Sequence, residues 1–141
     1  MSRIIRTPTP GKDRGTLSKA IVITIREFIR LQEPDESTND MIAFIILALE
    51  EIFDGIEKSV VAWEKRGYWV KADKYRMDWQ WTGPMASQLD TAFLASDWSN
   101  IAGLLMQLME HFSDIKVSDK HRMGQPWENA YMEYQTGHRK A

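Results

Sequence analysis

Residues 41–49, MIAFIILAL, form an uninterrupted apolar run inside a stretch with helical periodicity. A helix that is apolar on every side has to be surrounded by other elements, whereas a surface helix keeps a polar face. The nine residues of this run are far fewer than the roughly 20 that cross a bilayer. The run therefore predicts a helix at the centre of an α-helical bundle and no membrane span.

The end of this central helix decides how many helices the bundle has. Its spacing of three and four residues continues past Gly67 as far as Trp81, and one glycine inside a helix costs only about 1 kcal/mol. We therefore expect one long helix to about Trp81, bent at Gly67. The alternative is a break at Gly67, because Lys65 and Arg66 followed by glycine are typical of a helix C-terminus.

Two further long helices are expected to pack against the central one. The first spans Thr16 to Gln32 and ends before Pro34, because the residue before a proline disfavours the helical conformation. The other runs from about Pro84 to Asp114, and its apolar residues alternate steps of four and three: Leu94, Trp98, Ile101, Leu105, Leu108, Phe112 and Ile115.

The predicted fold class is all-α, since no alternating polar and apolar run indicates a strand. The architecture we expect is an antiparallel bundle of three long helices, or four if the second breaks at Gly67. A short aromatic helical segment follows at the C-terminus, with Trp127, Tyr131 and Tyr134 on one face.

Length and composition fit a single domain. A chain of 141 residues buries enough surface to fold without disulfides or metals. The absence of cysteine excludes thiolate zinc sites, iron–sulfur clusters and thiol nucleophiles. Residues 16–141 are predicted to form one helical-bundle domain, preceded by a flexible basic tail over residues 1–15, whose cations are Arg3, Arg6, Lys12 and Arg14.

Charge is distributed in blocks along the chain, although its net value is only −2. Residues 31–60 carry eight acidic residues against one lysine, and residues 61–80 carry five basic residues against three acidic ones. Neighbouring blocks of opposite sign favour neutralisation between helices. A nucleic-acid binder usually presents one coherent basic face, so no nucleic-acid partner is expected.

Aromatic residues concentrate between Trp63 and Trp81, in the sequence WEKRGYWVKADKYRMDWQW. On a continuous helix, at about 100° per residue, one face holds Trp63, Val70, Met77 and Trp81 and continues the interior stripe. A second face, roughly 140° around, holds Tyr68, Tyr75 and Trp79, while Trp69 stands between the two. The basic residues do not line either face, which argues against a platform for stacking bases.

The second aromatic face needs a cover, either the aromatic C-terminal segment or a second copy of the chain. The predicted interaction residues are therefore the aromatic members of both regions: Tyr68, Trp69, Tyr75, Trp79, Trp127, Tyr131 and Tyr134. This set favours packing or self-association over a ligand groove.

Carboxylates between Glu50 and Glu57 suggest a metal site as an alternative hypothesis. If the second and third helices are antiparallel, Asp54 faces His111 and Glu51 faces Asp114. Carboxylate-bridged metal bundles, however, use a Glu-x-x-His spacing, and that spacing is absent here. A solvated acidic face is the simpler interpretation, and no cofactor is predicted.

Motifs of catalysis do not occur in the chain. There is neither a G-x-S-x-G elbow nor a Gly-rich phosphate loop. We therefore expect a non-enzymatic, cytoplasmic module for protein–protein interaction or assembly, with a homodimer as the default state. A small-molecule or metal-binding bundle is the alternative function.

Overall fold

The computed structural model describes residues 10–31, 33–118 and 120–139, with side chains from Arg14 to Gly137. These residues form six helices and no strand: α1 (Pro10–Arg30), α2 (Glu36–Lys65), α3 (Trp69–Trp79), α4 (Thr82–Leu94), α5 (Trp98–His111) and α6 (Ala130–Arg139). The all-α class is confirmed. The sequence led us to expect three or four long helices and one short C-terminal helical segment, so the described ranges contain more helices than expected.

Helix α1 begins earlier than the sequence predicted. It starts at Pro10 rather than Thr16, and proline suits the first turn of a helix because its missing N–H has no partner there anyway. Residues 10–15 of the expected tail therefore belong to α1. Arg3, Arg6 and the side chain of Lys12 lie outside the described part of the chain.

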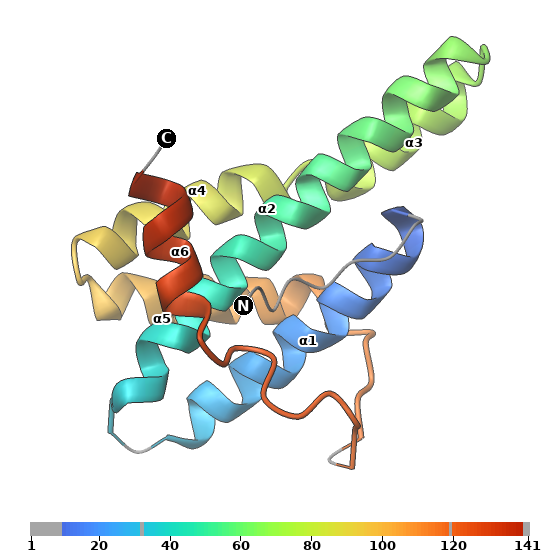
Figure 1. Cartoon of the computed structure of the whole chain (residues 1–141). Coiled ribbons are helices and arrows are strands. Elements are labelled where there is room, and N and C mark those ends of the chain that lie inside the picture. Colours follow the sequence, from blue (N-terminus) through green and yellow to red (C-terminus); the bar gives the residue numbers. More distant parts are fainter. Residues whose placement is uncertain (1–9, 32, 119, 140–141) are drawn as a thin grey trace.

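Helix α2 occupies the centre of the molecule and packs against α1, α3, α4 and α6 (Figure 1). Its start is fixed by Asp35, whose carboxylate accepts a hydrogen bond from the Ser37 N–H at 2.8 Å while the Thr38 hydroxyl accepts from the Asp35 N–H. The apolar run 41–49 is buried except for the half-buried Leu47, as expected of a helix surrounded on all sides.

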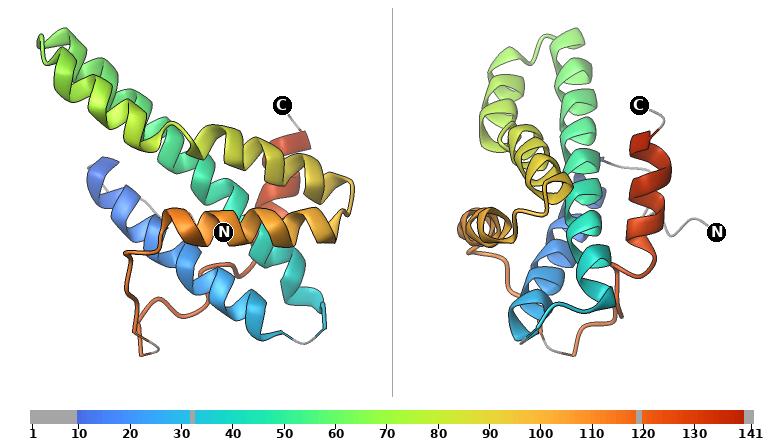
Figure 2. Two further views of the ribbon diagram at one scale, coloured as in Figure 1. Left: turned by 180° about the vertical axis from the view of Figure 1, so that it is seen from behind. Right: turned by 90° about the vertical axis from the view of Figure 1, so that its left-hand side faces the viewer.

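The break at Gly67 is real, so the expectation of one helix to Trp81 is wrong. Helix α2 ends at Lys65, Gly67 has a φ of +83°, and α3 begins at Trp69. Left-handed backbone of this kind is readily adopted only by glycine. Helix α3 runs back along the C-terminal half of α2, and this hairpin projects beyond the other helices (Figures 1 and 2). We call residues 57–79 the arm.

The predicted helix from Pro84 to Asp114 is also divided in two. Ser96 has a φ of +53° between α4 and α5, and the Asp97 carboxylate caps α5 by accepting from the Asn100 N–H at 3.2 Å. Helix α5 packs mainly on α4 and only slightly on α1. The expected antiparallel pairing of α2 with residues 98–114 is therefore not formed.

Helix α6 covers the N-terminal half of α2 rather than the arm. It packs on α2, where the Tyr131 N–H donates to Asp40 at 2.9 Å. Both views of Figure 2 place it away from α3. Within the ranges that the structure describes, no helix is both long and apolar enough to span a bilayer.

One buried hydroxyl predicts a stabilising substitution in α1. Ser18 is buried, and its Oγ has no hydrogen-bond partner among the described residues. An unsatisfied buried polar group is destabilising, so Ser18→Ala is expected to raise the free energy of unfolding by about 1 kcal/mol. Thermal unfolding should show a melting temperature about 2–4 °C higher.

A control for this substitution lies six residues further along the same helix. The Thr24 hydroxyl is also buried, but it donates to the Ala20 carbonyl at 2.8 Å. Thr24→Val should therefore bring no gain. A melting temperature of Ser18→Ala at or below that of the unaltered protein would contradict the assignment of Ser18 as unsatisfied.

Candidate functional site: the arm and the groove at its base

The aromatic residues expected to form one interaction surface are distributed over two separate places. Tyr68 and Trp69 lie at the tip of the arm, where they are 54% and 60% exposed. Tyr75 and Trp79 are half-buried on the side of α3 that faces α1. The remaining three, Trp127, Tyr131 and Tyr134, lie on the far side of the molecule around α6.

The α1-facing side of the arm is filled by the chain itself. The Tyr75 and Trp63 rings are 4.8 Å apart. The Arg14 guanidinium lies 5.1 Å from the centre of the Tyr75 ring and 5.0 Å from that of Trp79, and it donates a hydrogen bond to the Tyr75 hydroxyl. Burial lowers the pKa of Arg14 from its ordinary value. This cation–π contact ties α1 to the arm.

The C-terminal aromatic residues are part of the core and do not cover the arm. Trp127 and Tyr134 are buried, and Tyr131 is half-buried. Phe93 of α4 lies 5.7 Å from the Tyr131 ring and 5.3 Å from the Tyr134 ring, and the Tyr134 hydroxyl donates to Asp90. The hypothesis that this segment hides the second aromatic face of residues 63–81 is therefore wrong.

The most exposed apolar residues of the arm were assigned to the interior by the sequence. Val70 and Met77, placed on the buried stripe of a continuous helix, are 85% and 72% exposed. The turn at Gly67 reverses the chain, so that Ala72 of α3 is fully buried instead. Val61 of α2 is also exposed, and the sequence analysis made no prediction for it.

The arm has exposed apolar residues on both of its helices. At about 100° per residue, Phe53, Glu57 and Val61 follow one another around one side of α2. Phe53 and Glu57 line the same hollow as Met77 of α3, and Val70 lies two helical turns before Met77. Trp69 lies about 100° around α3 from Val70. We call the exposed apolar surface of the arm, made of Val61, Trp69, Val70 and Met77, the arm face.

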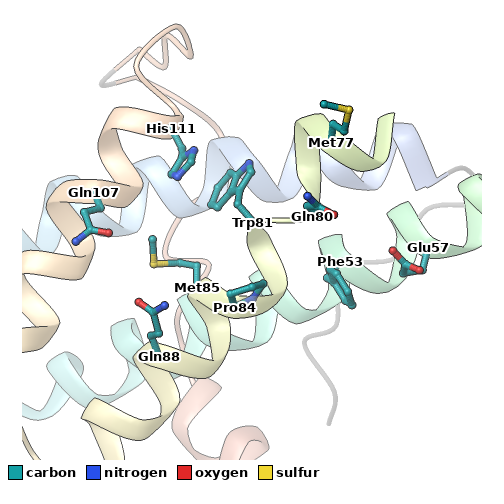
Figure 3. Close-up of a pocket in the computed structure, with 10 residues that line it drawn as sticks. All are labelled: Phe53, Glu57, Met77, Gln80, Trp81, Pro84, Met85, Gln88, Gln107 and His111. Atoms are coloured by element: carbon teal, nitrogen blue, oxygen red, sulfur yellow. The ribbon is translucent and has the colours of Figure 1, made fainter. Parts of the chain in front are cut away.

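A groove opens at the base of the arm, where α2, α3, α4 and α5 meet. Its volume is about 620 Å³, and Figure 3 shows the residues that line it: Phe53, Glu57, Met77, Gln80, Trp81, Pro84, Met85, Gln88, Gln107 and His111. The floor is aromatic and methionine-rich, and three glutamine side chains surround it. Met77 belongs to both the groove and the arm face.

The rings of Trp81 and His111 form one wall of the groove. Their centroids are 3.7 Å apart and their planes differ by 6°, and the Trp81 N–H donates to the Asp78 carbonyl at 3.0 Å. The position of His111 is thus explained by stacking on Trp81. Asp54, which the sequence placed opposite His111, lies on α2 as an exposed residue.

Metal-binding geometry does not occur in the described part of the chain, where no group of three or more His, Asp or Glu residues is placed to hold an ion. The alternative ligand set of Glu51, Asp54, His111 and Asp114 is therefore not gathered at one point. Each of these four residues is exposed. Nothing in the geometry favours the metal-binding hypothesis.

Charges of both signs occur along the arm. On α2, Glu57 and Lys58 lie at the base, and Lys65 and Arg66 follow Glu64 at the tip. Arg76 of α3 donates to Glu64 of α2 at 3.0 Å. The hydrogen bond to Glu64 raises the pKa of Arg76. This ion pair joins the two helices of the arm.

Comparison of the chain with protein-family models, with curated proteins and with solved structures finds no match. The class of molecule is therefore defined by its own fold: an all-α protein with a projecting helical hairpin and a groove at the base of that hairpin. The comparisons add no family to this description.

Proposed function

We propose that this chain is a non-enzymatic assembly module that self-associates through its arm. The observation that carries the proposal is the exposure of the arm face, where Val70 and Met77 are 85% and 72% accessible on a two-helix projection. A helix pair with apolar residues on its outer side is half of a four-helix bundle, and a second pair completes it.

The arm face differs from the other exposed apolar residues in that its members gather on one projecting hairpin. Ile29, Leu94, Met106 and Met132 are also exposed, but each lies on a different helix, and single exposed apolar residues are normal in monomeric proteins. Several exposed apolar side chains on one projecting element, by contrast, favour an interaction site.

The size of the arm indicates that both of its helices take part. A standard interface buries about 800 Å² on each partner, and a fully covered aromatic side chain contributes roughly 150–250 Å². Tyr68 and Trp69 alone cannot reach this area. The neighbouring side chains of Val61 and Met77, on α2 and α3, supply the apolar remainder.

Size-exclusion chromatography with light scattering tests the proposal. The unaltered protein is expected to elute at micromolar concentration with twice its chain mass of 16.4 kDa. The double variant Val70→Glu with Met77→Glu should elute as a monomer, because burying an unpaired carboxylate in the interface is strongly unfavourable.

The matched control places the same two charges on other exposed apolar residues. Leu94→Glu with Met132→Glu alters α4 and α6, where the original side chains are 72% and 70% exposed, and should leave the dimer unchanged. The proposal would be contradicted if the unaltered protein were a monomer, or if both double variants dissociated the dimer to the same extent.

A further inference from the structure

We propose that two copies pair with their arms antiparallel, so that the arm tip of each copy, centred on Trp69, docks in the groove of the other. This inference rests on the proposed self-association and adds to it a register and a docking site. Three features of the arm support it: the side on which the groove opens, the order of its charges, and the exposure of its tip.

The groove and two members of the arm face, Val61 and Met77, lie on the same side of the arm. Phe53 and Glu57 line the groove, and Val61 follows them after one more turn of α2. Met77 of α3 is one of the residues that line the groove (Figure 3). A second arm lying on Val61 and Val70 therefore reaches the groove without crossing to another side of the molecule.

The charges of α2 are self-complementary about Val61. When two copies of α2 lie antiparallel with Val61 beside a two-fold axis, residues whose numbers add to 122 lie at the same level. Lys65 then faces Glu57 of the second copy, and Lys58 faces its Glu64. Because the pairing is isologous, each of these contacts occurs twice. The parallel arrangement would place Lys65 against Lys65.

The same register brings the arm tip to the edge of the groove. Helix α2 ends at Lys65, at the level of Glu57 of the second copy, and Glu57 is part of the groove lining. Beyond the turn at Gly67, the Tyr68 N–H donates to the Trp63 carbonyl at 2.9 Å, so Tyr68 and Trp69 lie beside this end of α2. The groove is an open hollow of about 620 Å³, which an aromatic side chain can enter from solvent.

The lining suits an exposed tryptophan. Met77 and Met85 have flexible, polarisable side chains that adapt to aromatic rings, and the stacked rings of Trp81 and His111 form an aromatic wall beside them. Glutamine carbonyl groups at the rim, on Gln80 and Gln88, are acceptors for the N–H of an incoming Trp69. Trp69 is 60% exposed in the single chain.

Cross-linking between single-cysteine variants tests the register directly, because the chain has no cysteine of its own. Tyr68→Cys marks the tip and Gln80→Cys marks the groove. Each chain then carries only one cysteine, so a short bismaleimide can join only two different chains. The proposed docking places the tip cysteine of one chain beside the groove cysteine of the other, and a mixture of the two variants should give a covalent dimer that contains one copy of each.

The controls separate this inference from the proposed function. Tyr68→Cys mixed with Met132→Cys should give no covalent product, and neither should Tyr68→Cys alone. If Tyr68→Cys alone cross-links, or if no pair does so while light scattering shows a dimer, the antiparallel docking is wrong and self-association still stands. If the unaltered protein is monomeric, both proposals fail.

Charge reversal gives a second readout that does not depend on a linker. Glu57→Lys and Lys65→Glu should each weaken the dimer about tenfold in Kd, since each change creates two like-charge contacts. Combining both changes in one chain restores both pairs and should return the Kd to within about threefold of its original value. Glu128→Lys on the opposite part of the molecule should have no effect. A double variant weaker than either single one would overturn the register.

Discussion

Replacing Tyr134 with alanine is expected to lower the free energy of unfolding by about 3–5 kcal/mol, the usual range for removing a buried aromatic ring. Tyr134 is 3% exposed, packs on Phe93 and donates its hydroxyl hydrogen to Asp90. The substitution leaves a cavity beside Phe93 of α4 and removes one hydrogen bond to Asp90. Urea denaturation followed by circular dichroism measures the loss.

Met132 on the same helix provides the control for Tyr134. Its side chain is 70% exposed, so Met132→Ala should change the free energy of unfolding by no more than about 0.5 kcal/mol. Equal effects of the two substitutions would mean that α6 is not packed on α2 and α4 as described. Since α6 lies away from the arm, neither change should alter self-association while the protein remains folded.

The Tyr134 hydroxyl also predicts a pH dependence. Burial, and then the hydrogen bond to Asp90, raises the pKa of this hydroxyl above its ordinary value of 10.0. The folded protein thus holds the proton more tightly than the unfolded chain does. This contribution to stability is complete below about pH 10 and is lost as the pH rises through the folded-state pKa.

Comparison with Tyr134→Phe isolates this titration, because phenylalanine keeps the ring and lacks the hydroxyl. The unaltered protein should be the more stable of the two at about pH 8, and its advantage should shrink above about pH 10. An advantage that stays constant into alkaline solution would show that the hydroxyl is not held in its neutral form by the fold.

The parts of the fold that the sequence predicted are those fixed by local physics. The apolar run 41–49 had to be central because no side of it could face water, and it is buried apart from part of Leu47. This feature depends on neighbours in the sequence alone.

The sequence-based prediction of the candidate site failed because the chain changes direction at two points, Gly67 and Ser96. The stripe through Val70 and Met77 was interpreted as interior because its spacing continues that of α2, but the turn at Gly67 reverses the helix and turns these residues outwards. A second turn at Ser96 follows the stripe residue Leu94, which ends α4 and is exposed. Periodicity records spacing within a helix and carries no information about which side is covered after a turn.

The groove could not be predicted either, because its walls come from four helices. Trp81 and His111 are thirty positions apart and stack only because α5 returns beside the start of α4. The sequence assigned His111 to a metal set with acidic residues of α2, on the assumption of two straight antiparallel helices. That assumption fails at Gly67, and the metal geometry fails with it.

Gly67 is therefore the residue on which the arm depends, and Gly67→Ala is expected to cost about 1–2 kcal/mol in the free energy of unfolding, the cost of a side chain in left-handed backbone. Gly103 is the matched control. It lies inside α5, and a Cβ there meets no atom within 4 Å, so Gly103→Ala should stabilise the protein by about 0.5–1 kcal/mol.

The opposite signs of these two substitutions make the comparison decisive. A Cβ at Gly67 also meets no atom within 4 Å, so steric contact cannot account for a loss of stability there, and only the backbone conformation remains. Gly67→Asn should cost less than Gly67→Ala, because asparagine tolerates left-handed backbone better. If Gly67→Ala instead stabilises the protein as Gly103→Ala does, residues 57–79 form the continuous helix that their spacing suggests, and the arm does not exist.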